Sequence, residues 1–162
     1  MSHFEAQSIN TPGVAIRALL VGAWALKGYT DIQYGAPAAQ PFGAKPAGLL
    51  IYTSDGFVSA QLMQPERQSS HSPLWSGWSR EEFAAFGRGY IGYCGRYEVD
   101  EKYGTVTHLP SVAFLPNLIG QRLLRQVSVT GNHLILKTSY TLIDGSNATS
   151  LLEWSRISSN HV

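Results

Sequence analysis

The sequence contains a single cysteine and few charged residues, and both scarcities narrow the class of protein. Cys94 is the one cysteine among 162 residues, so no disulfide can form within the chain, which suits a reducing compartment. Charged residues make up 14% of the chain, the formal net charge is +1, and no basic run is present. We therefore expect no nucleic-acid partner, and we expect Cys94 to be a buried, inert thiol.

Long apolar runs are also lacking. The most apolar stretch, residues 13–26, is interrupted by Arg17 and is too short to span a bilayer. The first ten residues are polar and lack the basic start of a signal peptide. We expect a cytoplasmic protein without membrane contact, built as one domain over residues 1–162 with a flexible N-terminal arm over about residues 1–12. For the oligomeric state, the sequence fits either a monomer or a homodimer.

Motifs for covalent, nucleotide or metal chemistry are missing. The chain has no G-x-S-x-G, no phosphate loop and no paired-carboxylate motif. Residues 87–92 spell G-x-G-x-x-G, but the predicted order of helix, glycines and strand is the reverse of a dinucleotide site. The five histidines have no metal-pair spacing, and a second cysteine is lacking. We expect neither a cofactor nor a metal.

Short segments with alternating apolar and polar residues fill most of the chain. Turn signals such as Asp55-Gly56, Gly131-Asn132 and Asp144-Gly145 separate them, a pattern typical of an all-β sandwich or barrel. We predict eight antiparallel strands that close into an up-and-down barrel with room for one small ligand. The predicted strands are residues 20–34, 47–53, 57–63, 90–99, 105–114, 121–129, 133–140 and 149–158.

Two helical segments accompany these strands. Residues 13–19 predict a short helical entry, and Ser79 with Glu82 forms a capping box ahead of a helix between the third and fourth strands, about residues 80–88. Trp75 and Trp78 precede this helix, where they either form a lid over a ligand or pack under the helix.

In the first strand, the even positions form the predicted apolar face. Leu20, Trp24, Leu26 and Ile32 belong to this face, which leaves Lys27, Tyr29 and Asp31 on the opposite face.

Several segments together resemble the bacterial and fungal lipocalin-like domain family over about residues 18–157. They are Gly22-Ala23-Trp24, residues 48–56, 59–63, 93–99, 104–108 and 114–117, and Leu152-Glu153-Trp154-Ser155-Arg156. The resemblance implies a calycin-type barrel closed at one end, with Arg156 packed over Trp24 there. Some fungal proteins with lipocalin-like folds are cofactor-free cyclases or isomerases of natural-product pathways, although fold alone does not fix function.

Three residues are the candidates for catalysis. His108 lies within a predicted strand and serves either as a general acid or base or as a hydrogen-bonded core histidine. Arg125 shares its face with Leu123 and Val127, so it needs an anion, which either the ligand or a glutamate (Glu98 or Glu153) would supply. Tyr93 is the candidate tyrosine for moving the proton.

A further group of residues is predicted to contact the ligand, although parity alone leaves the inward face of these strands open. The group comprises Tyr52, Gln61, Met63, Trp75, Tyr90 and Tyr97. These features predict a protein that binds a small hydrophobic or aromatic metabolite. It would act as a cofactor-independent isomerase or cyclase of secondary-metabolite biosynthesis, or alternatively as a carrier without turnover.

Overall fold

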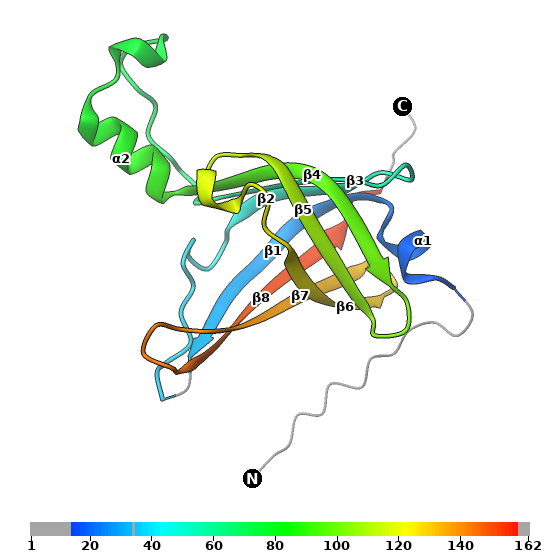
Figure 1. Cartoon of the computed structure of the whole chain (residues 1–162). Helices are drawn as coiled ribbons and strands as arrows, with labels where there is room; N and C mark the ends of the chain where they lie inside the picture. The colour runs from blue at the N-terminus through cyan, green and yellow to red at the C-terminus, as the bar shows by residue number, and fades with distance from the viewer. Residues whose placement is uncertain (1–13, 34, 159–162) are drawn as a thin grey trace.

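The protein, described by a computed structural model over residues 14–33 and 35–158, is a closed barrel of eight antiparallel strands in sequence order (Figure 1). Each strand pairs with the next, and the last pairs with the first, which confirms the predicted barrel. The strands are β1 (Gly22–Gln33), β2 (Ala47–Tyr52), β3 (Phe57–Met63), β4 (Tyr90–Asp100), β5 (Thr105–Ala113), β6 (Leu123–Thr130), β7 (His133–Thr141) and β8 (Asn147–Arg156). The expected arm over residues 1–12 lies outside the described residues.

Two α-helices, α1 (Ile16–Leu20) and α2 (Arg80–Arg88), lie in the two predicted helical segments. Two 3-10 turns, η1 (Trp75–Gly77) and η2 (Pro116–Leu118), complete the elements. No helix in the described ranges is long and apolar enough to cross a membrane.

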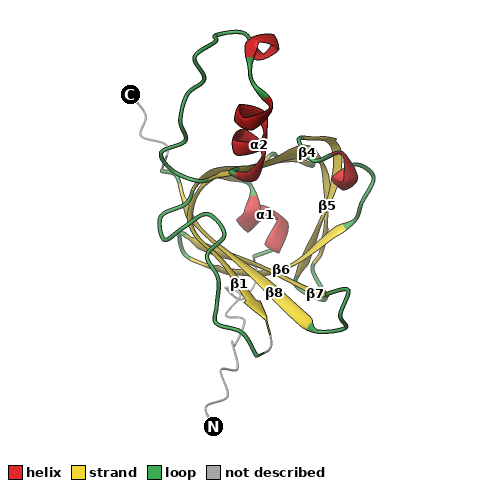
Figure 2. Cartoon of the chain, turned by 90° about the vertical axis from the view of Figure 1, so that its left-hand side faces the viewer, coloured by secondary structure: helices red, strands yellow, loops and turns green. Residues whose placement is uncertain are grey.

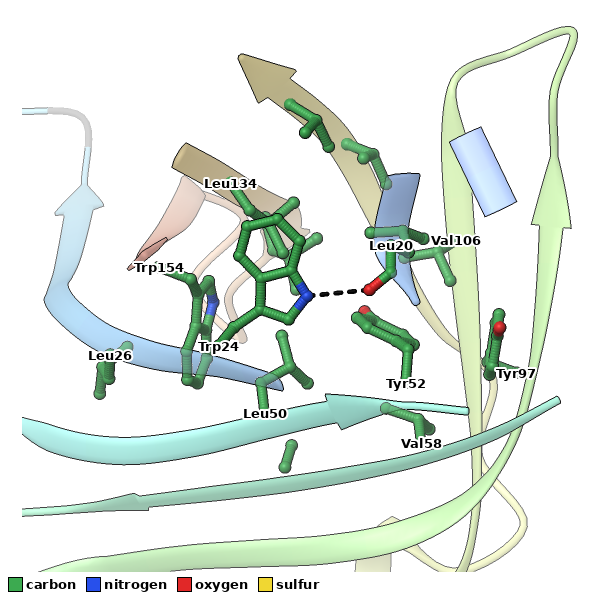
Figure 3. Packing of buried hydrophobic residues seen from close by; sticks show 14 of the residues in the cluster. Leu20, Trp24, Leu26, Leu50, Tyr52, Val58, Tyr97, Val106, Leu134 and Trp154 are labelled. Carbon is green, nitrogen blue, oxygen red and sulfur yellow. Dashed lines mark hydrogen bonds between the residues drawn. The ribbon is translucent and has the colours of Figure 1, made fainter. Parts of the chain in front are cut away.

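One end of the barrel is closed by α1, which Figure 2 shows behind the ring of strands. Trp24 is fully buried there, and its indole Nε1 donates a hydrogen bond to the Leu20 carbonyl at 2.8 Å (Figure 3). The Arg156 guanidinium lies 4.1 Å from the Trp24 ring centroid and donates to the carbonyls of Val21 and Leu19. The register pairs Trp24 with Arg156, as the family resemblance implied.

A β-bulge changes the inward face of β1. The register with β8 shifts between Leu26 and Gly28, and such an extra residue moves every later side chain to the other face. Trp24 and Leu26 are buried, as predicted, whereas Ile32 is 42% exposed and Tyr29 lines the barrel interior. The prediction that Ile32 shares one face with Trp24 and Leu26 is therefore wrong beyond the bulge.

Residues 64–89, which we call the projecting arm, stand out from the barrel rim between β3 and β4 (Figures 1 and 2). The Ser79–Glu82 capping box begins α2 as predicted. Trp78 packs on this helix, with ring centroids 5.3 Å from Phe83 and 4.8 Å from Phe86, whereas Trp75 is 71% exposed. Of the two expected roles, Trp78 therefore has the second, because it packs on the helix. Neither tryptophan covers the barrel interior.

Candidate ligand-binding site

The barrel encloses a cavity of about 360 Å³, a size typical of small-molecule sites. Most of its wall is apolar: Leu50, Ala60, Leu62, Ile91, Leu123, Leu136, Leu152 and Trp154. Polar side chains enter the cavity in two groups, one on β4–β6 and the other on β1, β7 and β8. Because the strands close in sequence order, these groups occupy adjacent halves of the barrel wall, which meet where β6 pairs with β7.

The first group is centred on His108 of β5, which is buried to 1% exposure. Its Nε2 lies 2.6 Å from the hydroxyl of Tyr52 on β2, and its Nδ1 lies 2.7 Å from the hydroxyl of Tyr93 on β4. Both ring nitrogens are therefore occupied by tyrosines. Alternation along the strands turns Tyr52, Tyr93 and His108 inward, together with the buried Val106.

All three side chains of this group are neutral near pH 7. Burial lowers the pKa of His108 to about 3, and the nearby charge of Arg125 lowers it further. Burial raises the pKa of Tyr52 well above 10 and also raises that of Tyr93, against the opposing effect of Arg125.

A neutral imidazole has one donor nitrogen and one acceptor nitrogen, and this restricts the direction of the two hydrogen bonds. Tyr52 is fully buried, and among the described residues its hydroxyl bonds to His108 alone. We therefore assign the Tyr52 O–H as the donor to Nε2, so that Nδ1–H donates to the Tyr93 oxygen. The Tyr93 O–H is then left to donate toward the cavity, which Tyr93 lines.

Arg125 lies beside Tyr93 on the cavity wall and is half-buried. Glu98, one of its two expected partners, instead pairs with Arg122 at 2.7 Å. Glu153 neighbours the buried, inward Trp154 on β8, so alternation places it on the outer face. Within residues 14–33 and 35–158, Arg125 has no ion pair, and Nη1 donates to the Leu124 carbonyl at 3.2 Å. Tyr93 and Arg125 therefore both present hydrogen-bond donors to the cavity, and we call them the donor pair.

The second group surrounds Ser150 of β8, whose hydroxyl donates to the Asp31 carboxylate at 2.5 Å. The Tyr140 hydroxyl lies 3.4 Å from the Ser150 hydroxyl. Burial, and after it the neighbouring Asp31 carboxylate, raises the pKa of Tyr29 to about 12. Thr138 Oγ1 also belongs to this wall and, like Trp154 Nε1, is buried without a hydrogen-bond partner among the described residues.

The structure brings together the three residues selected as catalytic, because His108, Tyr93 and Arg125 all line the cavity. Tyr52 supports them from behind His108. Tyr97 is buried away from the cavity, where its hydroxyl donates to the Thr53 carbonyl at 2.8 Å.

The other predicted contacts do not reach this cavity. Val58, Ala60 and Leu62 are the buried positions of β3, so Gln61 and Met63 point outward. Tyr90 lies outside as well, hydrogen-bonded to Gln61 and packed edge-on against Phe114. Trp75 is exposed on the projecting arm. Gln61, Met63, Tyr90 and Trp75 therefore do not line this cavity, and their predicted contact with a ligand stays a prediction. Cys94 is partly rather than fully buried.

Sequence reasoning missed Tyr29, Thr138, Tyr140 and Ser150. Strand parity was the available signal for three of them, since Thr138 and Tyr140 follow Leu136, and Ser150 shares the face of Trp154. Tyr29 gave no such signal, because the bulge in β1 reverses its face.

Comparison with known proteins agrees with this architecture. Over 107 residues the chain is 31% identical to a 4'-hydroxy-3'-methoxypropiophenone carrier protein of Aspergillus oryzae; the match covers 62% of this chain and 96% of the relative. The family model of the lipocalin-like domain matches residues 21–157, which include all eight strands and the cavity. Barrel and relative together support binding of a small molecule. The chain belongs to the lipocalin-like domain family.

Proposed function

We propose that this protein is a carrier that binds one small, largely apolar metabolite through a carbonyl or oxygen anion in the barrel cavity. The observation that carries the proposal is the donor pair, Tyr93 and Arg125, in a cavity whose wall is mostly apolar. Hydrogen bonds to an oxygen acceptor are stronger in such a low-dielectric site than in water. The apolar wall favours an aromatic or hydrophobic body for the same ligand.

The relative's name supports both the class of ligand and the class of function. The compound in that name is an aromatic ketone, which combines an apolar ring with a carbonyl oxygen. The name also describes a carrier. A ligand of this kind would place its carbonyl at the donor pair and its ring against the leucines of the wall.

The protonation state of the site favours binding over catalysis. His108 is held neutral, and both its ring nitrogens are bonded to tyrosines, so it has no free lone pair for a proton of the ligand. We infer that His108 is a positioning residue that aims the Tyr93 hydroxyl.

A second candidate function is a cofactor-free isomerase or cyclase. It is favoured by one specific feature, the hydrogen-bonded series Tyr52–His108–Tyr93 ending beside Arg125. Tyr93, after losing its own proton to solvent, would take the α-proton of a carbonyl compound, which regenerates the neutral phenol and leaves an enolate. Arg125 would stabilise that enolate, and the Tyr93 O–H would return the proton at another atom; such electrostatic stabilisation contributes about 10²–10³-fold for one donor.

Binding is tested by titrating 4'-hydroxypropiophenone into the protein by calorimetry. We expect one site, and we expect Tyr93→Phe and Arg125→Met each to weaken binding by about tenfold, the usual effect of losing one such bond. Tyr103→Phe and Arg122→Met are matched controls, because both side chains are exposed. Absence of binding to the wild-type protein would refute the proposal for this ligand class.

The two candidates are separated by following the α-protons of propiophenone in D₂O by NMR. A carrier leaves their exchange at the rate in buffer. An isomerase that forms an enolate accelerates the exchange, and Tyr93→Phe abolishes that acceleration. Accelerated exchange that depends on Tyr93 would refute the carrier proposal in favour of the isomerase.

A further inference from the structure

We propose that Thr138, Tyr140 and Ser150, on the β7–β8 side of the cavity, form an acceptor site that binds a hydroxyl group of the same ligand. The cavity would then select ligands with two functional ends, an oxygen acceptor at one end and a hydroxyl donor at the other. This inference rests on the proposed binding function and specifies its substrate class.

Ser150 supplies the acceptor because its own proton is already engaged. Its hydroxyl donates to the Asp31 carboxylate at 2.5 Å, and the residue is 9% exposed on the cavity wall. A hydroxyl has one proton and two lone pairs. The Tyr140 hydroxyl, 3.4 Å away, can occupy one lone pair, so Ser150 keeps the other as an acceptor for a ligand O–H. The charge of Asp31 makes its bond with Ser150 strong and fixes its direction.

The buried hydroxyl of Thr138 independently indicates a ligand contact beside Ser150. It pairs with Ser150 across β7 and β8, and both line the cavity. Its Oγ1 is buried and has no hydrogen-bond partner within the described part of the chain. Buried hydroxyls are normally satisfied, and a ligand hydroxyl held between Thr138 and Ser150 would satisfy this one.

The backbone holds Asp31 rigidly in position. Its N–H donates to the Ala39 carbonyl, and the Ala39 N–H donates back to the Asp31 carbonyl, both at 2.8 Å. The carboxylate makes no ion pair within the described ranges, so its negative charge is not neutralised there. Asp31 on β1 and Arg125 on β6 are three strands apart in the closed barrel. Their opposite charges therefore act on the cavity from different directions, which favours one orientation of a polar ligand.

A series of three ketones tests this assignment by calorimetry: 4'-hydroxypropiophenone, 4'-methoxypropiophenone and propiophenone. All three carry the carbonyl for the donor pair, but only the first can donate a hydrogen bond from its ring. We expect the wild-type protein to bind the hydroxy compound about tenfold more tightly than the methoxy compound. Ser150→Ala and Thr138→Val should each reduce this preference severalfold, with little effect on propiophenone.

Asp31→Asn tests the positioning of Ser150. It keeps the shape of the side chain and removes the charge, so we expect a reduced preference for the hydroxy compound with unchanged affinity for propiophenone. Ser139→Ala is the matched control for Ser150→Ala, since Ser139 is exposed on the outer face of β7. Thermal melts establish that each variant is folded.

The outcomes separate this inference from the proposed function. Equal binding of all three ketones by the wild-type protein refutes the acceptor site and leaves the binding function intact. A preference that survives in both Ser150→Ala and Thr138→Val places the ligand hydroxyl elsewhere and also refutes it. Failure of all three ketones to bind refutes both proposals for aryl ketones.

Discussion

At the scale of single residues, the interior is defined by which hydrogen-bonding atoms are already engaged. His108 contributes no free nitrogen to the cavity because two tyrosines occupy its ring. Ser150 contributes an acceptor because its own O–H already donates a hydrogen bond to the Asp31 carboxylate. Two ordinary polar side chains thereby acquire defined roles from their neighbours, and neither role is visible in the residue type alone.

His108 makes a pH-dependent contribution to stability. Its pKa is about 3 in the folded protein and about 6.5 when unfolded, so below pH 6.5 the unfolded chain binds a proton that the folded barrel does not. The free energy of unfolding should therefore fall by about 2 kcal/mol between pH 6.5 and pH 5, and should not change from this source above pH 7. Urea melts across this range measure the effect. His108→Gln should remove this part of the slope, whereas the exposed control His133→Gln should not; identical slopes in all three proteins would contradict the prediction.

Trp24 and Trp75 give a matched comparison of two tryptophans. Trp24 has no exposed surface at the closed end, whereas Trp75 is 71% exposed. We expect Trp24→Ala to lower the free energy of unfolding by about 3–5 kcal/mol, and Trp75→Ala to change it by no more than about 0.5 kcal/mol. Denaturant melts measure both. A loss below about 1 kcal/mol for Trp24→Ala would contradict the packing under Arg156.

At the scale of elements, the β1 bulge and the projecting arm separate what sequence could predict from what it could not. Alternation and turn residues such as Asp55-Gly56 located all eight strands, and Ser79 with Glu82 located α2. Patterning did not show that the register shifts after Leu26, so Tyr29 was assigned to the wrong face. For β3, both faces carry apolar side chains, which left Gln61 and Met63 undecided until the pairing was known.

The pairing at the base of the projecting arm predicts that the barrel folds without this arm. Met63 and Tyr90 are still paired across β3 and β4, and the Gln64 N–H donates to the Gly89 carbonyl at 3.0 Å. Replacing residues 65–88 by Asn-Gly should therefore give a tight β-hairpin. We expect the free energy of unfolding to change by no more than about 2 kcal/mol, since loop shortening itself contributes little. Ligand affinity should be unchanged. Loss of the folded barrel or of binding would show that the arm is structurally or functionally required.

At the scale of the whole molecule, the closed barrel makes ligand binding and stability one equilibrium. A ligand held inside the cavity is surrounded by strands that enclose it only when β8 pairs with β1. Ligand at 100 times its dissociation constant should add about 2.7 kcal/mol to the free energy of unfolding. For a chain of this size, that corresponds to an increase in Tm of about 5–11 °C.

Filling the cavity should remove this stabilisation without unfolding the barrel. Ala60 lines the cavity from β3, so Ala60→Phe places a ring where the ligand would lie. The matched variant Ser59→Phe places the same ring on the outer face of the same strand, where aromatic residues are favoured in a sheet. With 4'-hydroxypropiophenone present, scanning calorimetry should show the increase in Tm for the wild-type protein and Ser59→Phe. It should be lost in Ala60→Phe, because the ring excludes the ligand from the interior. If Ala60→Phe is folded and keeps the full increase, the ligand binds outside the barrel, and the cavity is not the binding site.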